Sequence, residues 1–238
     1  MVWRICKFIK HLFYIRHRKG HGIHSPYLFG FVNSVLFNRE GVELPRFIWN
    51  EHRKLRAENV FVRRSSVTRK YGFLLYRITR WFHPEMIIEL GTGLGISTIY
   101  LSAGSPETPL HSIEHNKERA AWAAQLICRC CPGPVSIHVG GMEERLEDVL
   151  HLLPNRFVAF VDGNHHYGPT VAYVESLLER VEDEAVIVMD DIYWSRGMQR
   201  AWKKLIDRDE VRVSIDLFHM GILFTGKELQ KKKFKIKF

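Results

Sequence analysis

The chain has 238 residues, of which 46% are hydrophobic, enough to bury one full core with an appendage to spare. No apolar run approaches the roughly 18 to 20 residues that a membrane-spanning helix needs, and the N-terminus lacks the apolar stretch and cleavage site of a signal peptide. We therefore expect a cytoplasmic protein. Its four cysteines form neither a disulfide framework nor a zinc-finger spacing.

Charge is distributed unevenly along the chain. Residues 1–80 carry a net charge of +13 and residues 227–238 carry +5, which leaves −9 for residues 81–226. Clustered Lys and Arg supply affinity for phosphate, so the basic ends suggest nucleic acid as one class of partner. We find no recognisable RNA-binding module, which argues against that class.

Residues 2–15 predict a basic amphipathic helix. Its apolar arc contains Val2, Ile5, Phe8, Ile9, Leu12, Phe13 and Ile15, and its polar arc contains Arg4, Lys7, Lys10 and His11. Followed by the basic run 16–19, such a helix is typical of a peripheral anchor that would hold residues 2–19 on the inner face of the membrane. The alternative, which we favour, is a helix packed on its own domain or on a second subunit of a homodimer.

The stretch from Gly20 to Pro26 (GHGIHSP) predicts a loop, in which Ser25 caps the following helix and Pro26 occupies its first position. Residues 40–82 predict further basic helix, which ends at His83 because a residue before proline avoids helical geometry. We therefore expect a basic N-terminal helical cap or extension over residues 1–82, a core over 83–226 and a basic tail over 227–238.

The core begins with a predicted strand, Met86 to Ile88, that leads into Glu89 and three glycines at alternate positions before an apolar helix. Glycines at 91, 93 and 95 let the chain turn tightly and bring its backbone against a ligand. A dinucleotide fingerprint would need a sixth-position glycine, where this chain has Ile96. The alternative is a sharp turn without a ligand.

Acidic residues follow the later predicted strands, 109–113, 157–161 and 185–189. Glu114 ends the first of these, where sheets of this kind hold ribose hydroxyls, although an acid there also suits a helix N-terminus. Asp162 follows the second, and Asp190 and Asp191 follow the third. Carboxylates gathered at strand ends need a cation or shifted pKa values, and oxygen ligands suit Mg²⁺.

The remaining predicted elements are a strand over 135–139, followed by Gly140, Gly141 and Met142, and a hairpin over 211–225. The tail alternates Lys with apolar residues, which is typical of an edge strand.

The run Glu-x-Gly-x-Gly-x-Gly at residues 89–95 resembles motif I of class I S-adenosylmethionine (SAM) dependent methyltransferases. The order of motifs over residues 83–226 is also similar to that family. The resemblance implies an α/β fold, a doubly wound Rossmann-like sheet that is mostly parallel with an antiparallel C-terminal hairpin, preceded by the helical cap. It also implies a set of SAM-binding residues, of which Met142 would line the adenine: Glu89, Gly91, Gly93, Gly95, Thr98, Glu114, Met142 and Asp162.

Asp162, Asp190 and Asp191 resemble the metal site of the catechol and macrolide-sugar O-methyltransferases, with Asp-Asp as in the sugar enzymes. His165 lies where the catechol-type enzymes carry a lysine base, so the resemblance makes His165 and Asp162 the catalytic candidates, with His166 as the alternative base. GHGIHSP resembles the HGxHSP stretch of a group of uncharacterised bacterial methyltransferase-like proteins.

These resemblances imply transfer of a methyl group from SAM to a hydroxyl of a small molecule, with help from Mg²⁺. Two alternatives stay open. One is a nucleic-acid-directed methyltransferase or binding protein, which the lack of an Asn-Pro-Pro-Tyr-like motif disfavours, and the other is a membrane-associated SAM-binding protein without activity. The acceptor is open among a sugar, a phenol, a lipid-linked intermediate and a protein.

Overall fold

The computed structural model describes residues 2–13, 22–37 and 45–238, so the predicted basic run 16–19 and the helical residues expected at 14–15 and 40–44 lie outside the described residues. The chain divides into two compact units. Residues 1–37 and 153–238 form one, called the N/C unit, and residues 38–152 form the other, called the middle unit. The predicted domain boundaries near residues 82 and 226 stay a prediction.

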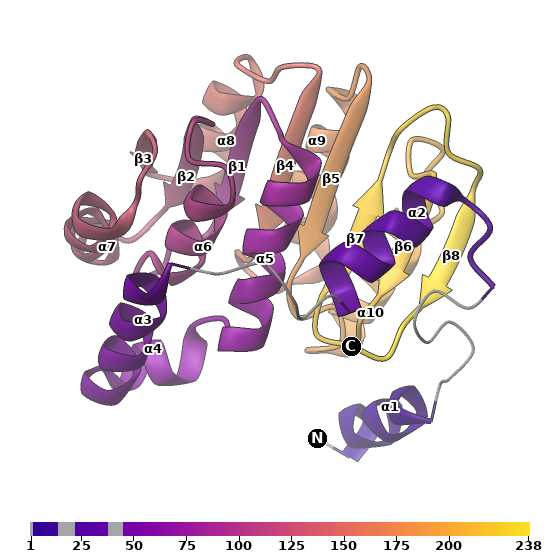
Figure 1. Cartoon of the computed structure of the whole chain (residues 1–238), viewed down its shortest axis with the longest axis horizontal. Helices are drawn as coiled ribbons and strands as arrows, with labels where there is room; N and C mark the ends of the chain where they lie inside the picture. Colours follow the sequence, from indigo (N-terminus) through magenta and orange to yellow (C-terminus); the bar gives the residue numbers. More distant parts are fainter. Residues whose placement is uncertain (1, 14–21, 38–44) are drawn as a thin grey trace. The chain divides into compact units, whose positions relative to one another are not determined.

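The middle unit contains three parallel strands in the order β3-β2-β1. They are β1 (Met86–Leu90), β2 (Leu110–Glu114) and β3 (Val135–Val139) (Figure 1). Every residue of β1 is buried, as expected for an apolar strand of a parallel sheet. Leu90 is in register with Ile113, and Glu114 with Val139. The carboxyl ends of the three strands therefore lie at one edge.

The helices of the middle unit are α3 (Arg46–Glu58), α4 (Val60–Ser65), α5 (Arg69–Phe82), α6 (Ile96–Gly104), α7 (Lys117–Cys130) and α8 (Met142–Leu150). α5 packs closely on α6 because Gly72 leaves room for the ring of Tyr100, and a Cβ at Gly72 would lie 2.6 Å from that ring. α5 ends at His83 in the left-handed conformation, before Pro84, as predicted.

The N/C unit contains five strands in the order β4-β5-β7-β6-β8. They are β4 (Arg156–Val161), β5 (Glu184–Met189), β6 (Val213–Asp216), β7 (Gly221–Phe224) and β8 (Lys232–Lys235). β4 and β5 are parallel, and β7 runs antiparallel to both β5 and β6. The predicted Rossmann-like fold with an antiparallel hairpin is therefore confirmed, and β8 is the predicted edge strand.

The helical elements of the N/C unit are α1 (Val2–Leu12), α2 (Pro26–Phe31), the π-helix η2 (Val32–Phe37), α9 (Tyr167–Glu179) and α10 (Arg196–Leu205). Ser25 caps α2 by accepting a hydrogen bond from the Leu28 N–H at 3.4 Å, as the sequence predicts. α2 packs on β7, where the rings of Phe31 and Phe224 lie 4.9 Å apart (Figure 1). No helix within the described residues is long and apolar enough to cross a membrane.

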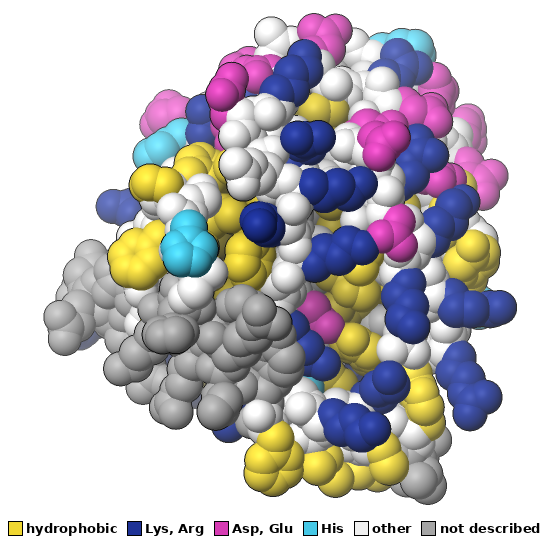
Figure 2. All heavy atoms as spheres, turned by 90° about the vertical axis from the view of Figure 1, so that its right-hand side faces the viewer, with side chains coloured by type: hydrophobic (Ala, Val, Ile, Leu, Met, Phe, Trp, Pro, Cys, Tyr) yellow, Lys and Arg dark blue, Asp and Glu magenta, His cyan; other side chains and the backbone are white. Residues whose placement is uncertain are grey.

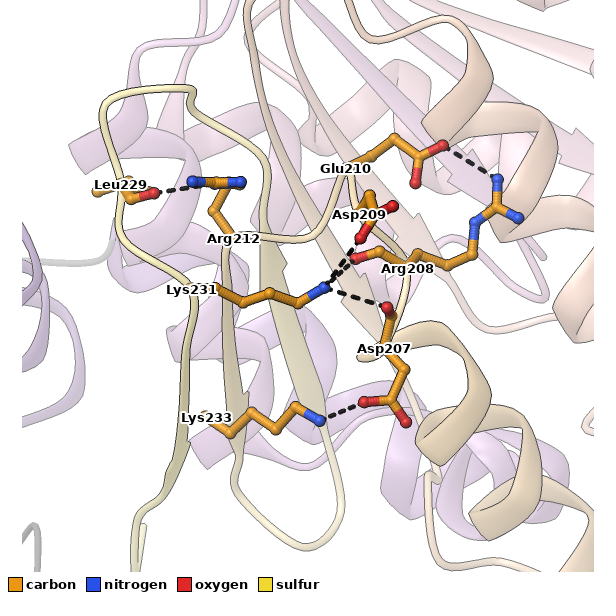
Figure 3. Close-up of polar contacts among 8 residues, drawn as sticks. All are labelled: Asp207, Arg208, Asp209, Glu210, Arg212, Leu229, Lys231 and Lys233. Atoms are coloured by element: carbon orange, nitrogen blue, oxygen red, sulfur yellow. Dashed lines mark hydrogen bonds and ion pairs between the residues drawn. The ribbon is translucent and has the colours of Figure 1, made fainter.

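Lysines of the basic tail bind the turn after α10 (Figure 3). Lys231 Nζ donates hydrogen bonds to the carbonyl oxygens of Asp207 and Arg208, at 3.1 and 3.0 Å, and Lys233 pairs with the Asp207 carboxylate. The same lysine, Lys231, lies 3.5 Å from a carboxylate oxygen of Asp209. Part of the charge that suggested a nucleic-acid partner is therefore used to hold the edge strand.

His52, on α3, is fully buried in the middle unit. Its Nδ1 lies 2.9 Å from the hydroxyl of Tyr100. Burial, with a smaller contribution from the charge of Arg56, lowers the pKa of His52 to about 4. The folded protein therefore holds this ring neutral well below the pH at which an exposed histidine becomes charged.

The burial of neutral His52 predicts a loss of stability in mild acid. Because its pKa is lower in the folded than in the unfolded chain, the stabilisation is complete above about pH 6.5 and is lost as the pH falls toward the folded pKa. We expect the free energy of unfolding to fall by roughly 2 kcal/mol between pH 7 and pH 5 from this group. Urea unfolding at several pH values measures it. The His52→Phe variant should lose this part of the pH dependence, whereas the exposed control His151→Gln should keep it.

Candidate functional site

The glycine loop after β1 depends on a backbone conformation that only glycine adopts readily. Gly91, Gly93 and Gly95 have φ angles of 104°, 55° and 83°, all in the left-handed region. A Cβ built at Gly93 meets nothing within 4 Å, so the space beside this glycine is open. The loop therefore presents bare backbone to open space at the carboxyl end of β1, as a ligand-binding turn requires.

A buried carboxylate holds the two ends of this loop together. Glu89 is fully buried, and its Oε2 accepts hydrogen bonds from the hydroxyls of Thr98 and Ser112, both at 2.6 Å. Thr98 lies in the first turn of α6 and Ser112 lies on β2. Glu89 and Thr98, predicted together as cofactor-binding residues, are thus in contact with each other in the interior. Their contacts fix β1, β2 and α6 around the loop.

Glu114, at the end of β2, lies directly against the loop. Its two carboxylate oxygens accept hydrogen bonds from the backbone N–H groups of Gly93 and Asn116, both at 2.9 Å. The Nδ1 atom of His115 lies 3.2 Å from the same carboxylate. The strand register brings together the glycine loop and the acid that the sequence placed at separate strand ends.

The turn after β3, with Gly140 and Met142, lies at the same edge of the sheet as the glycine loop and Glu114. The N–H of Gly140 donates to the carbonyl oxygen of Glu114 at 3.1 Å, which ties the turn to the end of β2. Met142 is the first residue of α8 and is half-buried. The structure therefore gathers the predicted loop, acid and methionine at one edge of the middle unit.

The predicted carboxylates of the N/C unit follow β4 and β5. The side chains of Asp162 and Asp190 are hydrogen-bonded to each other. Burial raises the pKa of both groups, and the negative charges of Asp162 and Asp191 raise the pKa of Asp190 further, well above its ordinary value. The proton between two carboxyls in such contact is therefore held more tightly than by an isolated carboxyl.

Asp191 is paired with a cation that sequence reasoning did not identify. The guanidinium of Arg4, on α1, lies 3.0 Å from Oδ1 of Asp191 and is stacked over the ring of Trp194 at 4.8 Å. Asp191 also has a left-handed backbone, with φ at 50°, although it is not a glycine. The only signal of Arg4 in the sequence is its place on the polar arc of the helix.

The predicted magnesium site does not fit this arrangement. Within residues 2–13, 22–37 and 45–238, no group of three or more His, Cys, Asp or Glu side chains is placed to hold a metal ion. The physical reason is that Asp191 is neutralised by Arg4, while Asp162 and Asp190 are hydrogen-bonded to each other. Asp162, Asp190 and Asp191 are thus neighbours, as predicted, but they do not converge as three metal ligands.

Of the two candidate bases, His165 contacts the carboxylates. Its Nε2 lies 3.4 Å from Oδ1 of Asp162. Burial lowers the pKa of His165, but the hydrogen bond and the charge of Asp162 outweigh it, and the net pKa is raised. His166 instead contacts the backbone oxygen of Asn164 through Nδ1 at 2.6 Å, which holds the loop. The geometry therefore favours His165 over His166 as a proton acceptor.

Comparisons with known proteins agree with the fold and with the motifs. Residues 88–192 match the model of a family described as a methyltransferase domain. A comparison with curated protein sequences finds no match. Similar solved structures include an O-methyltransferase from Bacillus cereus in complex with S-adenosylhomocysteine (SAH), at 19% identity and a TM-score of 0.63 over 84% of this chain and 97% of that one.

Two further structures show the same likeness. The O-methyltransferase TomG from Streptomyces achromogenes, in complex with SAM, is 20% identical with a TM-score of 0.62 over 81% of this chain and 95% of that one. The SAH-bound methyltransferase PaMTH1 from Podospora anserina is 13% identical with a TM-score of 0.67 over 88% of this chain and all of that one. The domain match supports the resemblance to methyltransferases over residues 88–192, and the solved structures share the fold of this chain.

The contact between His165 and Asp162 predicts a measurable pKa. We expect the pKa of His165, followed by NMR titration of its ring protons, to lie above that of an exposed histidine. In the Asp162→Asn variant it should fall, because burial then acts on the ring without the opposing carboxylate. The variant Asp183→Asn, at an exposed position, serves as the control and should leave the titration of His165 unchanged. A pKa that is insensitive to Asp162→Asn would contradict the contact.

Proposed function

We propose that this chain, which carries a methyltransferase domain over residues 88–192, transfers a methyl group from SAM to a hydroxyl oxygen of a small molecule. The observation that carries the proposal is the placement of the Glu114 carboxylate against the N–H of Gly93, beside a loop of three left-handed glycines. A carboxylate at this position can accept hydrogen bonds from two ribose hydroxyls. The SAM and SAH complexes of similar folds support the same cofactor.

The residues of the middle unit suit SAM in their chemistry. The open side of Gly93 leaves room for the cofactor against the backbone of residues 91–95, where a side chain would intrude. Glu114 would hold the ribose, and the half-buried side chain of Met142 would lie against the adenine. Glu89 and Thr98 would act by keeping the loop in place, since both are buried. When bound, SAM supplies a methyl group on a positively charged sulfur.

The acceptor must lose a proton as its oxygen gains the methyl group, and we assign that proton to His165. Its Nε2 faces Asp162, so Nδ1 is the nitrogen that would accept the hydroxyl proton. The Asp162 carboxylate favours the protonated ring, as the raised pKa of His165 indicates, and so makes the ring a stronger base. Asp162 would thus act as the group that orients and charges the base.

No step of this methyl transfer is assigned to Mg²⁺. In this arrangement Arg4 pairs with Asp191, and the raised pKa values of Asp162 and Asp190 favour their uncharged forms, so that less carboxylate charge is left for a metal. The identity of the acceptor as a small molecule rests on the resemblance to the catechol and macrolide-sugar enzymes. The O-methyltransferases among the similar folds support oxygen as the atom that is methylated.

Calorimetric titration with SAM tests the cofactor. We expect the intact protein to bind, and Glu114→Ala to bind about tenfold more weakly or worse, because a carboxylate that accepts two hydroxyl hydrogen bonds is lost. Gly93→Arg should abolish binding by filling the open side of the loop. The exposed Glu118→Ala is the matched control and should bind normally. Unchanged melting temperatures exclude misfolding, and the absence of binding to the intact protein would refute the proposed function.

Methyl transfer tests the proposed base. With radiolabelled SAM and panels of phenols and sugars, His165→Asn should lower the rate by about 10²- to 10⁴-fold, the usual contribution of a positioned base, while SAM affinity stays unchanged. His166→Asn should have a smaller effect, since His166 contacts the loop rather than Asp162. Activity that disappears with EDTA and returns with Mg²⁺ would restore the metal prediction and refute the metal-free assignment. Equal loss in both histidine variants would contradict the choice of His165.

A further inference from the structure

α1 packs on the rest of the N/C unit through side chains of its polar arc, whereas an amphipathic helix usually buries its apolar arc. Arg4 binds Asp191 and Trp194, as described above. His11, only 3% exposed, contacts the carbonyl oxygen of Ile236 through Nε2 at 3.1 Å. Two charged or polar side chains of the helix, nearly two turns apart, therefore point into the protein.

Further contacts hold the helix in this orientation. Nδ1 of His11 lies 3.8 Å from Asp216, whose carboxylate also accepts hydrogen bonds from the Tyr193 hydroxyl at 2.7 Å and the Phe218 N–H at 2.8 Å. The ring of Phe8, at the edge of the apolar arc next to Arg4, also packs inward and lies edge-on against the ring of Phe218 at 5.0 Å. Directional contacts at both ends of α1 thus oppose rotation of the helix about its axis.

As a result, three large side chains of the apolar arc face outward. Ile5, Ile9 and Phe13 are 51%, 47% and 79% exposed. These three residues, four apart in sequence and so on one face of the helix, are called the outer stripe. Large apolar side chains arranged in a row on the surface mark an interaction site, whereas single ones do not.

The charges around the outer stripe are positive. Residues 2–13 contain Arg4, Lys7 and Lys10 but no Asp or Glu, and Lys10 is exposed. The charge of Lys235, on β8, reaches His11, which places another cation near the same helix. In Figure 2, where the right-hand side of Figure 1 faces the viewer, hydrophobic side chains lie along the lower edge, with Lys and Arg side chains above them. The two acidic residues in contact with α1, Asp191 and Asp216, already interact with Arg4 and His11.

We propose that the outer stripe of α1 binds the surface of a lipid bilayer that contains anionic lipids. The stripe supplies apolar side chains for the acyl boundary, and the neighbouring lysines meet the lipid phosphates. A second copy of this chain fits less well, since it would bring two positive surfaces together. α1 has 11 residues and spans only about 16 Å, so it would lie in the interface without crossing the bilayer.

Vesicle co-sedimentation of the full chain tests this inference independently of any methyl transfer. The intact protein should bind vesicles of phosphatidylcholine mixed with phosphatidylglycerol, bind pure phosphatidylcholine much less, and be released by salt. The triple variant Ile5→Ser, Ile9→Ser, Phe13→Ser should bind the anionic vesicles at least about tenfold more weakly. The matched control is Trp122→Ser with Leu152→Ser, which removes exposed apolar side chains of the middle unit and should bind normally.

Two charge-reversal variants test the electrostatic part of the binding. Lys10→Glu should weaken binding to anionic vesicles, whereas Lys54→Glu, an exposed lysine on α3, should not. Binding that survives in the triple variant would assign it to basic residues elsewhere and overturn the proposal. An intact protein that ignores vesicles but dimerises in solution, and becomes monomeric in the triple variant, would show that a second copy covers the stripe and would also overturn it.

Discussion

The glycine loop depends on the hydrogen bonds that the buried carboxylate of Glu89 accepts. This carboxylate accepts two short hydrogen bonds inside the protein, from α6 and from β2, at the point where β1 turns into the glycine loop. A buried carboxylate is costly unless its hydrogen bonds are made, so any shift of these elements would be opposed. The loop itself contains three left-handed glycines and few side chains, and its shape is therefore set by the elements around it. The contacts of Glu89 thus give a glycine-rich segment one fixed conformation.

A second constraint acts in the N/C unit, where three carboxyl groups stand at the ends of two neighbouring strands. Like charges in a partly buried site must be neutralised, by a metal, by protons or by cationic side chains. Here the side chains of Asp162 and Asp190 are hydrogen-bonded to each other with raised pKa values, and the guanidinium of Arg4 pairs with Asp191. Since Arg4 comes from α1, the charge balance of the candidate catalytic carboxylates depends on the placement of the N-terminal helix.

The ion pair between Arg4 and Asp191 also explains the unusual orientation of α1, which turns basic side chains inward. A helix with apolar and basic arcs normally buries the apolar one, but here Asp191 offers a charged partner to Arg4, and the carbonyl oxygen of Ile236 offers a hydrogen-bond acceptor to His11. The ion pair offsets the cost of desolvating Arg4, and Ile5, Ile9 and Phe13 are left at the surface. The helix that neutralises the carboxylates is therefore also the one that can meet a lipid surface.

The sequence by itself determined the strands, the turn and the order of motifs, because these depend on local patterns. Buried strands read as apolar runs, a left-handed turn requires glycine, and acids at strand ends must gather when the strands are parallel and in register. It also predicted that α1 is amphipathic. The tertiary structure alone decided how α1 is oriented, that Arg4 pairs with Asp191, and that His165 rather than His166 contacts Asp162. Those outcomes depend on pairing between residues far apart in the chain, such as 4 with 191, and no local pattern encodes a distance of that kind.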